Sequence, residues 1–363
     1  MYFDTKLNWT FHLEKLIKMA QASLMTARNL VGRYWGLTPK VTKWIYTALV
    51  RPMITYGSIV WVTALRKSNI CKKFNSLQRM ACKMITSAIH STPTAGMEIL
   101  LGLLPLAEHI KLTATSTSVR MTRSGHWKVT AEDNPVNSHT GYLEAIRQEV
   151  PETYFPQDKS AFKERITAKF LTKIGDREDL KKNKIRPMPT DRNVVNCFTD
   201  GSKTETGTGA AYLIKGYQLK HQDFINLGCS ITVFQAEITA ISMAAQHMVD
   251  KSAMDHTINF YIDSQSAIKA LRSYLVYTKS VCECKRFLNK LSEKNMVCLN
   301  WIPGHEGQLG NEIADRLAKR GADLLTEGIE PRMAVSPCVA KTALENWFKS
   351  SQNTSWKNGL SSD

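Results

Sequence analysis

The order of the predicted elements between residues 192 and 325 constrains the fold most. Short β-branched runs predict strands over 194–200, 257–262 and 297–303, and the pattern over 207–227 predicts two strands joined at Lys215-Gly216. Apolar residues spaced three and four apart predict helices over 232–249, 264–275, 281–295 and 311–322. The resulting order, β-β-β-α-β-α-α-β-α, indicates an α/β domain with helices packed on a mixed sheet.

Four acids lie at informative places in this order. Asp200 and Asp263 end predicted strands, Glu237 lies in the first turns of a helix, and Asp315 lies in the last helix. Carboxyl ends of central strands face a common crevice, so Asp200 and Asp263 are expected to converge. Each acid alone is more often a helix cap or a solvated charge. The four together predict a divalent cation, and oxygen ligands without Cys or His favour Mg²⁺ or Mn²⁺ over zinc.

The residues around these acids resemble a known family. FTDGS, FQAEITAI, YIDSQSAIKAL and WIPGHEGQLGNEIADRLAKRGA are similar, in order and spacing, to the four motif blocks of the ribonuclease H family. The resemblance spans 192–325 and implies an α/β fold, a ribonuclease H-like mixed five-stranded sheet flanked by helices. It also implies a metal-dependent endonuclease that hydrolyses the RNA strand of RNA:DNA hybrids.

The resemblance assigns the family's metal-binding carboxylates to four residues: Asp200, Glu237, Asp263 and Asp315. It implies two Mg²⁺ ions, with Mn²⁺ as the alternative, roughly 4 Å apart. Asp200 would bridge both ions and Asp315 would complete the site on the water side, with Glu237 and Asp263 on the other. Glu237 would also sense the RNA 2′-hydroxyl.

Three further residues carry expected roles. The family's mobile histidine falls on His305, on a loop between Gly304 and Gly307, where it would transfer protons or help the product leave. A lone loop histidine is usually just solvated, so this role rests on the Pro-Gly-His context. Ser264 and Gln265 are expected to contact the hybrid substrate.

Other readings compete with this one. Proofreading exonucleases expect Asp-x-Glu on the first strand, whereas Asp200 is followed by Gly201 and Ser202. Integrases expect a Glu as the catalytic acid of the last helix, where this sequence has Asp315, and often an upstream His and Cys zinc module, which is not seen. A catalytically idle nucleic acid binding relic of a retroelement is the non-enzymatic alternative, and it predicts the loss of at least one acid, whereas all four are present.

Residues 1–130 are predicted to be a basic, mainly helical region. Helical apolar spacing recurs over 12–36, 38–57, 68–89 and 96–121, with Pro105 kinking or dividing the last segment. The region holds 18 Lys or Arg and four acids, which gives +14 of the chain's +16. So uneven a charge indicates contact with a nucleic acid backbone, although a solvated basic surface is the plain alternative.

The N-terminal region also resembles a retroelement protein. KLNWTFHLEKLIKMA, GLTPKVTKWIYTALVRPMITYGSIVW and TPTAGMEILLGLLPL are similar to the segment after the polymerase core of non-LTR retrotransposon reverse transcriptases. The chain has no Asp-Asp pair and no polymerase motif, so we expect no primer extension. The abrupt start suggests a fragment of a longer protein or a truncated copy. Residues 131–191 read as a polar linker and 326–363 as a C-terminal tail.

Two composition features bear on the compartment. The eight Cys residues are scattered, which indicates reduced thiols, and the N-terminus lacks a secretory signal pattern. We therefore expect an intracellular protein, cytoplasmic or nuclear, that is not bound to a membrane. The oligomeric state is unknown from the sequence.

Overall fold

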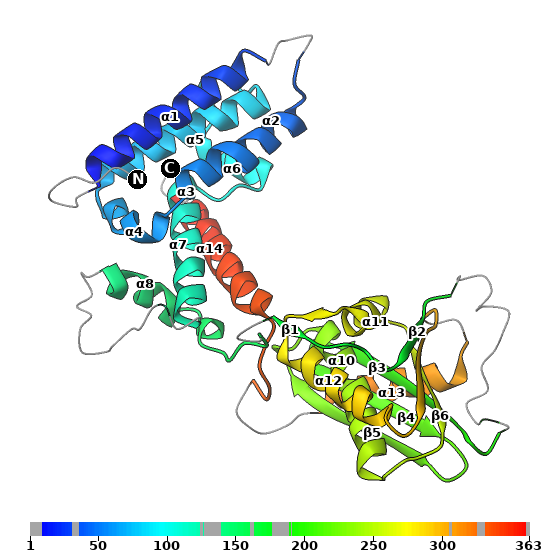
Figure 1. Ribbon diagram of the computed structural model, residues 1–363. Helices are drawn as coiled ribbons and strands as arrows, with labels where there is room; N and C mark the ends of the chain where they lie inside the picture. The colour runs from blue at the N-terminus through cyan, green and yellow to red at the C-terminus, as the bar shows by residue number, and fades with distance from the viewer. Residues whose placement is uncertain are drawn as a thin grey trace. The chain divides into compact units, whose positions relative to one another are not determined.

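The structure is a computed structural model. It describes residues 9–30, 36–123, 126, 139–159, 163–175, 189, 191–304, 307–324 and 331–360. The chain divides into two compact units (Figure 1). The first contains residues 1–154 and 340–363, and the second contains residues 155–339.

The first unit is helical. Its elements are α1 (Thr10–Arg28), α2 (Pro39–Ile45), η1 (Tyr46–Val50), α3 (Arg51–Thr55), α4 (Ser58–Trp61), η2 (Val62–Arg66), α5 (Ser68–Thr86), α6 (Thr94–Leu101), α7 (Leu106–Arg123), α8 (His139–Gln148), η4 (Pro151–Thr153) and most of α14 (Pro337–Leu360). The predicted helical character of the N-terminal region is confirmed. The segment over 96–121 divides into α6 and α7 ahead of Pro105, which cannot donate a helical hydrogen bond.

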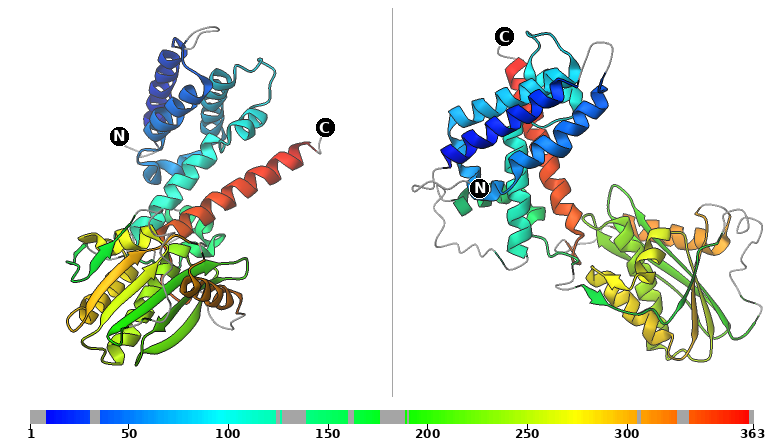
Figure 2. Two further views of the ribbon diagram at one scale, coloured as in Figure 1. Left: turned by 90° about the vertical axis from the view of Figure 1, so that its right-hand side faces the viewer. Right: turned by 45° about the horizontal axis from the view of Figure 1, so that its top comes forward.

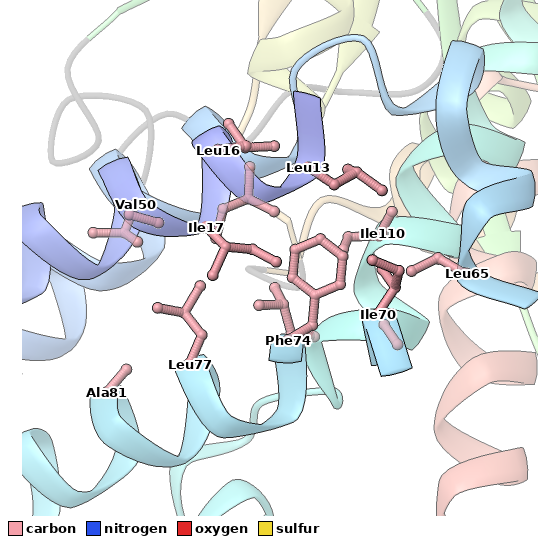
Figure 3. Close-up of a cluster of buried hydrophobic side chains, with 14 of the residues drawn as sticks. Leu13, Leu16, Ile17, Val50, Leu65, Ile70, Phe74, Leu77, Ala81 and Ile110 are labelled. Carbon is pink, nitrogen blue, oxygen red and sulfur yellow. The ribbon is translucent and has the colours of Figure 1, made fainter. Parts of the chain in front are cut away.

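The core of the first unit forms where the apolar faces of α1, α5 and α7 meet. Phe74 of α5 lies among side chains of α1 that recur every three or four residues, as Figure 3 shows. A second cluster joins α7 and α14 through Leu112, Val119, Leu344 and Phe348. The C-terminal residues expected to be a tail therefore form a helix, because their apolar positions have a buried partner in α7.

The second unit is built on a mixed sheet. Its strands run in the order β2 (Leu171–Lys173), β8 (Met296–Trp301), β6 (Thr257–Ile262), β3 (Val194–Lys203), β4 (Thr208–Lys215) and β5 (Lys220–Gly228). β3 pairs in parallel with β6, β6 in parallel with β8, and β3-β4-β5 form an antiparallel meander. The predicted α/β fold with a mixed sheet is confirmed.

Helices cover both faces of this sheet (Figures 1 and 2). α10 (Val233–Asp250), α11 (Gln265–Arg272) and α12 (Lys279–Leu291) share one core with Cys197 of β3. α13 (Leu309–Asp323) lies against the other face, where Ala314 packs on Phe198. Successive residues of a strand point to opposite faces, so β3 presents Asn196, Phe198 and Asp200 toward α13.

The second unit differs from the predicted domain in its flanks. The segment expected to be a linker adds β2 to the edge of the sheet and β1 (Glu164–Arg165), which pairs with β7 (Leu275–Val276). The sheet thus has a sixth strand among the described residues. These strands are two or three residues long, too short to show alternating hydrophobicity in the sequence.

All eight cysteines are free thiols in the structure. Among the described residues, no single helix is long and apolar enough to cross a membrane. One bent pair, Pro39–Thr55 with Ser58–Arg66, meets the length and composition criteria together, with 51° between its parts.

Candidate active site

The register of two parallel strands places two acids side by side. Thr199 of β3 pairs with Ile262 of β6, so the next residues, Asp200 and Asp263, lie beside each other. The Trp301 indole nitrogen donates a 2.9 Å hydrogen bond to the carbonyl oxygen of Asp263, which fixes the backbone where β6 ends. The predicted convergence of Asp200 and Asp263 is thus present in the structure.

Glu237 reaches the same place from α10 because the helix approaches β3 closely. A Cβ atom on Gly201 would lie 2.5 Å from the backbone nitrogen of Glu237 and 2.8 Å from the carbonyl carbon of Ala236. No side chain fits in that space. The backbone N–H of Gly201 also acts on the Glu237 carboxylate, whose pKa it lowers. Because residue 201 is a glycine, α10 can approach β3 closely enough for Glu237 to lie beside Asp200.

The three carboxylates form a compact group. Asp200, Glu237 and Asp263 can each offer one oxygen such that all these oxygens lie within 4.8 Å of one another. Asp200 and Glu237 are buried, at 6% and 5% exposure, and Asp263 is partly buried. Three acids at this separation in a buried place carry a high electrostatic cost unless a proton or a cation neutralises them.

Burial and mutual repulsion shift the ionisation of these acids. Burial, then the charges of Asp263 and Asp315, raise the pKa of Asp200 to about 7, and Lys319 opposes the rise. Burial, then Asp263 and Asp200, raise the pKa of Glu237 well above its usual value, although the Gly201 N–H opposes this. Such perturbation of clustered carboxylates is typical of functional sites.

The donor set fits a hard divalent cation. Among the described residues, the Glu237 Oε2 atom is buried and has no hydrogen-bond partner, although a buried carboxylate oxygen normally has one. The group consists of oxygen ligands only, which suits Mg²⁺ or Mn²⁺. Asp200, Glu237 and Asp263 can therefore hold a metal ion.

The fourth predicted acid stands slightly apart. Asp315, on α13, is outside the group of three, and its carboxylate accepts a 2.8 Å hydrogen bond from the Lys319 ammonium one turn later. Its charge nevertheless raises the pKa of Asp200, so it faces the same site. The structure thus brings three of the predicted ligands together and pairs the fourth with a lysine.

The other predicted residues are placed as follows. Ser264 caps α11, where its hydroxyl accepts a 3.3 Å hydrogen bond from the Ala267 N–H, and Gln265 is the first residue of that helix. Both follow Asp263 directly, so they lie at the edge of the carboxylate group. Their contact with a hybrid stays a prediction. His305 lies outside the described residues.

Two residues near the site were not predicted. The buried Asn311 side chain lies 3.5 Å, from Nδ2 to Oδ2, from Asp263, and a Cβ atom on Gly304 would lie 3.2 Å from the same Oδ2. Asn311 precedes Asp315 by four residues, so both lie on one face of α13. That spacing was the available signal in the sequence.

The chain has relatives among known proteins. Residues 192–323 match the RNase H family. The chain is 32% identical over 126 residues to the Pol polyprotein of equine infectious anemia virus (isolate 1369), covering 34% of this chain and 10% of that one. A retrovirus-related Pol polyprotein from a type-1 retrotransposable element R1 of Nasonia vitripennis is 25% identical over 105 residues, 27% of each chain. Ribonuclease H of Nitrosomonas eutropha is 26% identical over 152 residues, 38% of this chain and 94% of that one.

Each of these matches covers only part of the chain. The chain spans about a tenth of the viral polyprotein and about a quarter of the R1 protein, but nearly all of the bacterial ribonuclease H. The resemblance of residues 1–130 to a reverse transcriptase segment stays a prediction. The family match and the carboxylate group cover the same residues, and they agree with the fold. Residues 192–323 therefore form an RNase H domain.

Proposed function

We propose that this domain hydrolyses the RNA strand of RNA:DNA hybrids as a metal-dependent endonuclease. The observation that carries the proposal is the buried group of Asp200, Glu237 and Asp263, whose oxygens lie within 4.8 Å of one another. The similarity to proteins named ribonuclease H supports the choice of substrate.

Asp200, Glu237, Asp263 and Asp315 would hold two divalent ions. When bound, such ions activate the water and stabilise charge on the leaving 3′ oxygen. Among the residues that the structure describes, the buried Oε2 atom of Glu237 has no hydrogen-bond partner, so it is available to a metal ion. Lys319 contacts only the Oδ2 atom of Asp315, and a partly exposed ion pair of this kind would hinder metal binding by Asp315 only weakly.

Three residues would act on the substrate. His305 would transfer protons or help the product leave. Ser264 and Gln265 would contact the hybrid at the N-terminal end of α11, beside Asp263. A 2′-hydroxyl is present in the RNA strand and absent from DNA, so contacts to it from the site would select the RNA strand.

The helical unit would bind the nucleic acid backbone. A groove of about 360 Å³ between α1 and α5 is lined by Leu24, Met25, Arg28, Ser76, Arg79, Met80, Lys83 and Met84. Three of these residues are cationic and none is acidic, which suits a phosphate backbone. Arg79 is already fixed by donating to the carbonyl oxygens of His90 and Thr92, so Arg28 and Lys83 are the proposed phosphate contacts.

The similarity to the R1 Pol polyprotein supports an origin in a retrotransposon. We propose that this chain acts as part of such a retrotransposon-derived protein.

Cleavage of defined substrates tests the proposal. Purified full-length chain with Mg²⁺ is incubated with an end-labelled RNA:DNA hybrid, the matching DNA duplex, single-stranded RNA and single-stranded DNA. We expect internal cuts in the RNA strand of the hybrid only, and none when the metal is chelated. Equal cutting of the DNA duplex would contradict the proposed substrate.

A further inference from the structure

A buried acid outside the RNase H match lies near the helix that carries Glu237. Asp158 is 2% exposed and precedes the matched residues 192–323. Its backbone N–H donates a 2.8 Å hydrogen bond to the carbonyl oxygen of Val335, a residue that follows the matched region. The two flanks of the domain therefore meet at Asp158, where the chain forms a parallel bridge between Gln157 and Val335.

The Asp158 carboxylate ties two helices together. Its Oδ1 accepts a 2.9 Å hydrogen bond from the backbone N–H of Ser280, in the first turn of α12. Its Oδ2 accepts from the Ser280 hydroxyl, and at 3.2 Å from the Nε2 of Gln235, in the first turn of α10. Both oxygens thus accept hydrogen bonds, Oδ1 from α12 alone and Oδ2 from both α12 and α10.

Gln235 is fixed in turn by both flanks. Its Nε2 also donates a 2.9 Å hydrogen bond to the carbonyl oxygen of Ala334, and its Oε1 accepts a 3.1 Å hydrogen bond from the Ser336 N–H. The same Oε1 accepts a hydrogen bond from the backbone N–H of Thr232, the N-cap residue of α10, and so completes the capping box of this helix. The side chain is 1% exposed, so water cannot replace a lost partner easily.

Glu237 lies two residues after Gln235 on α10, where the helix backbone is in contact with Gly201. A shift of the first turn of α10 therefore moves the Glu237 carboxylate relative to Asp200. We infer that Asp158 is a positioning residue: by holding Gln235, it fixes the start of α10 and thus the place of Glu237 in the metal site. The inference rests on the proposed function for its effect on cleavage. It implies that the catalytic unit spans residues 155–339.

Asp158→Asn tests the inference with little change of shape. An amide can still accept from the Ser280 N–H, but its nitrogen would face the Nε2 of Gln235, so two donors would oppose each other. The matched control is Asn289→Ala. Asn289 also fastens an upstream segment to α12, through 2.8 Å hydrogen bonds with the carbonyl of Thr167 and the N–H of Lys169, but these bonds do not involve α10.

Both variants and the wild-type full-length chain are compared for Mn²⁺ affinity by calorimetry, Mg²⁺ dependence of hybrid cleavage, and melting temperature. We expect Asp158→Asn to raise the Mn²⁺ dissociation constant and the half-saturating Mg²⁺ concentration by up to about tenfold, the lower end of the effect of losing a direct contact to a metal ligand, because Asp158 acts on Glu237 through Gln235. Asn289→Ala should lower the melting temperature and leave both metal constants unchanged.

The outcomes separate the two proposals. Wild-type Mn²⁺ affinity in Asp158→Asn, or equal weakening in both variants, would overturn the positioning role. A wild-type chain that binds Mn²⁺ but cuts no hybrid would overturn the proposed function alone.

Should Asp158→Asn fail to fold, amide hydrogen exchange of the wild-type chain decides. The positioning role predicts that the N–H of Asp158 exchanges with the same protection as those of Ala236 and Glu237, because they open together. Exchange at residue 158 that is many times faster than at 236 and 237 would overturn it.

Discussion

The backbone of Gly201 is in direct contact with the backbone of Glu237: a Cβ atom added to the glycine would lie 2.5 Å from the Glu237 nitrogen. Gly201→Ala must therefore push α10 away from β3, since a backbone atom cannot turn aside as a side-chain end can. We expect the variant to lose about 1–3 kcal/mol of stability and at least tenfold in hybrid cleavage. Denaturant unfolding and a cleavage assay at saturating Mg²⁺ measure the two effects.

The matched control for this substitution is Gly96→Ala. Gly96 lies in α6, and a Cβ atom there would meet no atom within 4 Å. Alanine in a helix is favoured over glycine, so this variant should be unchanged or slightly more stable, with wild-type cleavage. If Gly201→Ala also cleaves the hybrid at the wild-type rate, the close approach of α10 to β3 is not required for cleavage.

The raised pKa of Asp200 makes the stability of the metal-free protein dependent on pH. Burial and the neighbouring acids raise its pKa to about 7, while an unfolded Asp titrates near 4. The folded state therefore binds this proton more tightly than the unfolded state does. The resulting stabilisation of the folded state is complete below about pH 4 and is lost as the pH rises through about 7.

Asp200→Asn removes that titration. In chelator at pH 8, the variant should melt about 5 °C above the wild type, which corresponds to roughly 2 kcal/mol, and the difference should shrink toward pH 4. Excess Mg²⁺ should raise the melting temperature of the wild type more than that of the variant. A variant that melts below the wild type in chelator at pH 8 would contradict the repulsion between these acids.

The sequence predicted the site because its acids lie at the ends of elements that the sequence also predicted. Asp200 and Asp263 lie at the ends of the predicted strands, whose parallel pairing brings them together, and Glu237 lies on a helix whose apolar residues recur every three or four positions. The four-residue spacing of Asp315 and Lys319 is compatible with an ion pair on the helix. Spacing alone does not determine whether Asp315 pairs with Lys319 or joins the other three acids, because that depends on the positions of the side chains.

The structure of the segments that flank the domain could not be predicted from the sequence. β1 and β2 are too short to show a period, and each exists because a strand edge is available to it. Asp158 meets Gln235, which is 77 residues away, and only the fold brings them together. α14 shows little separation of polar and apolar faces overall, so its partner in α7 determines which side is buried.

His305→Ala tests the expected role of the loop histidine. A residue that assists proton transfer or product release contributes less than a metal ligand does, so turnover should fall by about 10²-fold or less. Hybrid binding, measured by fluorescence anisotropy in Ca²⁺, should remain close to that of the wild type. Loss of Mn²⁺ binding in a calorimetric titration would show instead that His305 holds the metal.

The groove in the helical unit can be tested by the salt dependence of hybrid binding. Each phosphate contact contributes about 0.9 to the slope of log affinity against log salt. Arg28→Gln combined with Lys83→Gln should therefore weaken binding and flatten the slope by up to about 2, with the preference for RNA over DNA unchanged. Substitutions are preferable to deletion of residues 1–130, because α7 packs against α14.

The control for the groove variant carries the same change in charge elsewhere on the unit. Lys341→Gln combined with Lys349→Gln alters two exposed lysines of α14. This pair should leave the slope unchanged. Equal slopes for all three proteins would show that the cations of the groove serve only solubility.

The central claim is that the carboxylate group around Asp200 cleaves the RNA strand. Asp200→Asn keeps the shape of the shared ligand and removes its charge, so we expect native far-UV circular dichroism and at least a 10³-fold loss of hybrid cleavage in Mg²⁺. The direct measurement is the single-turnover rate of cleavage of an end-labelled RNA:DNA hybrid by wild type and variant under identical conditions. Cleavage by the wild type and none by Asp200→Asn is the predicted result, and a variant that cuts at the wild-type rate would contradict it.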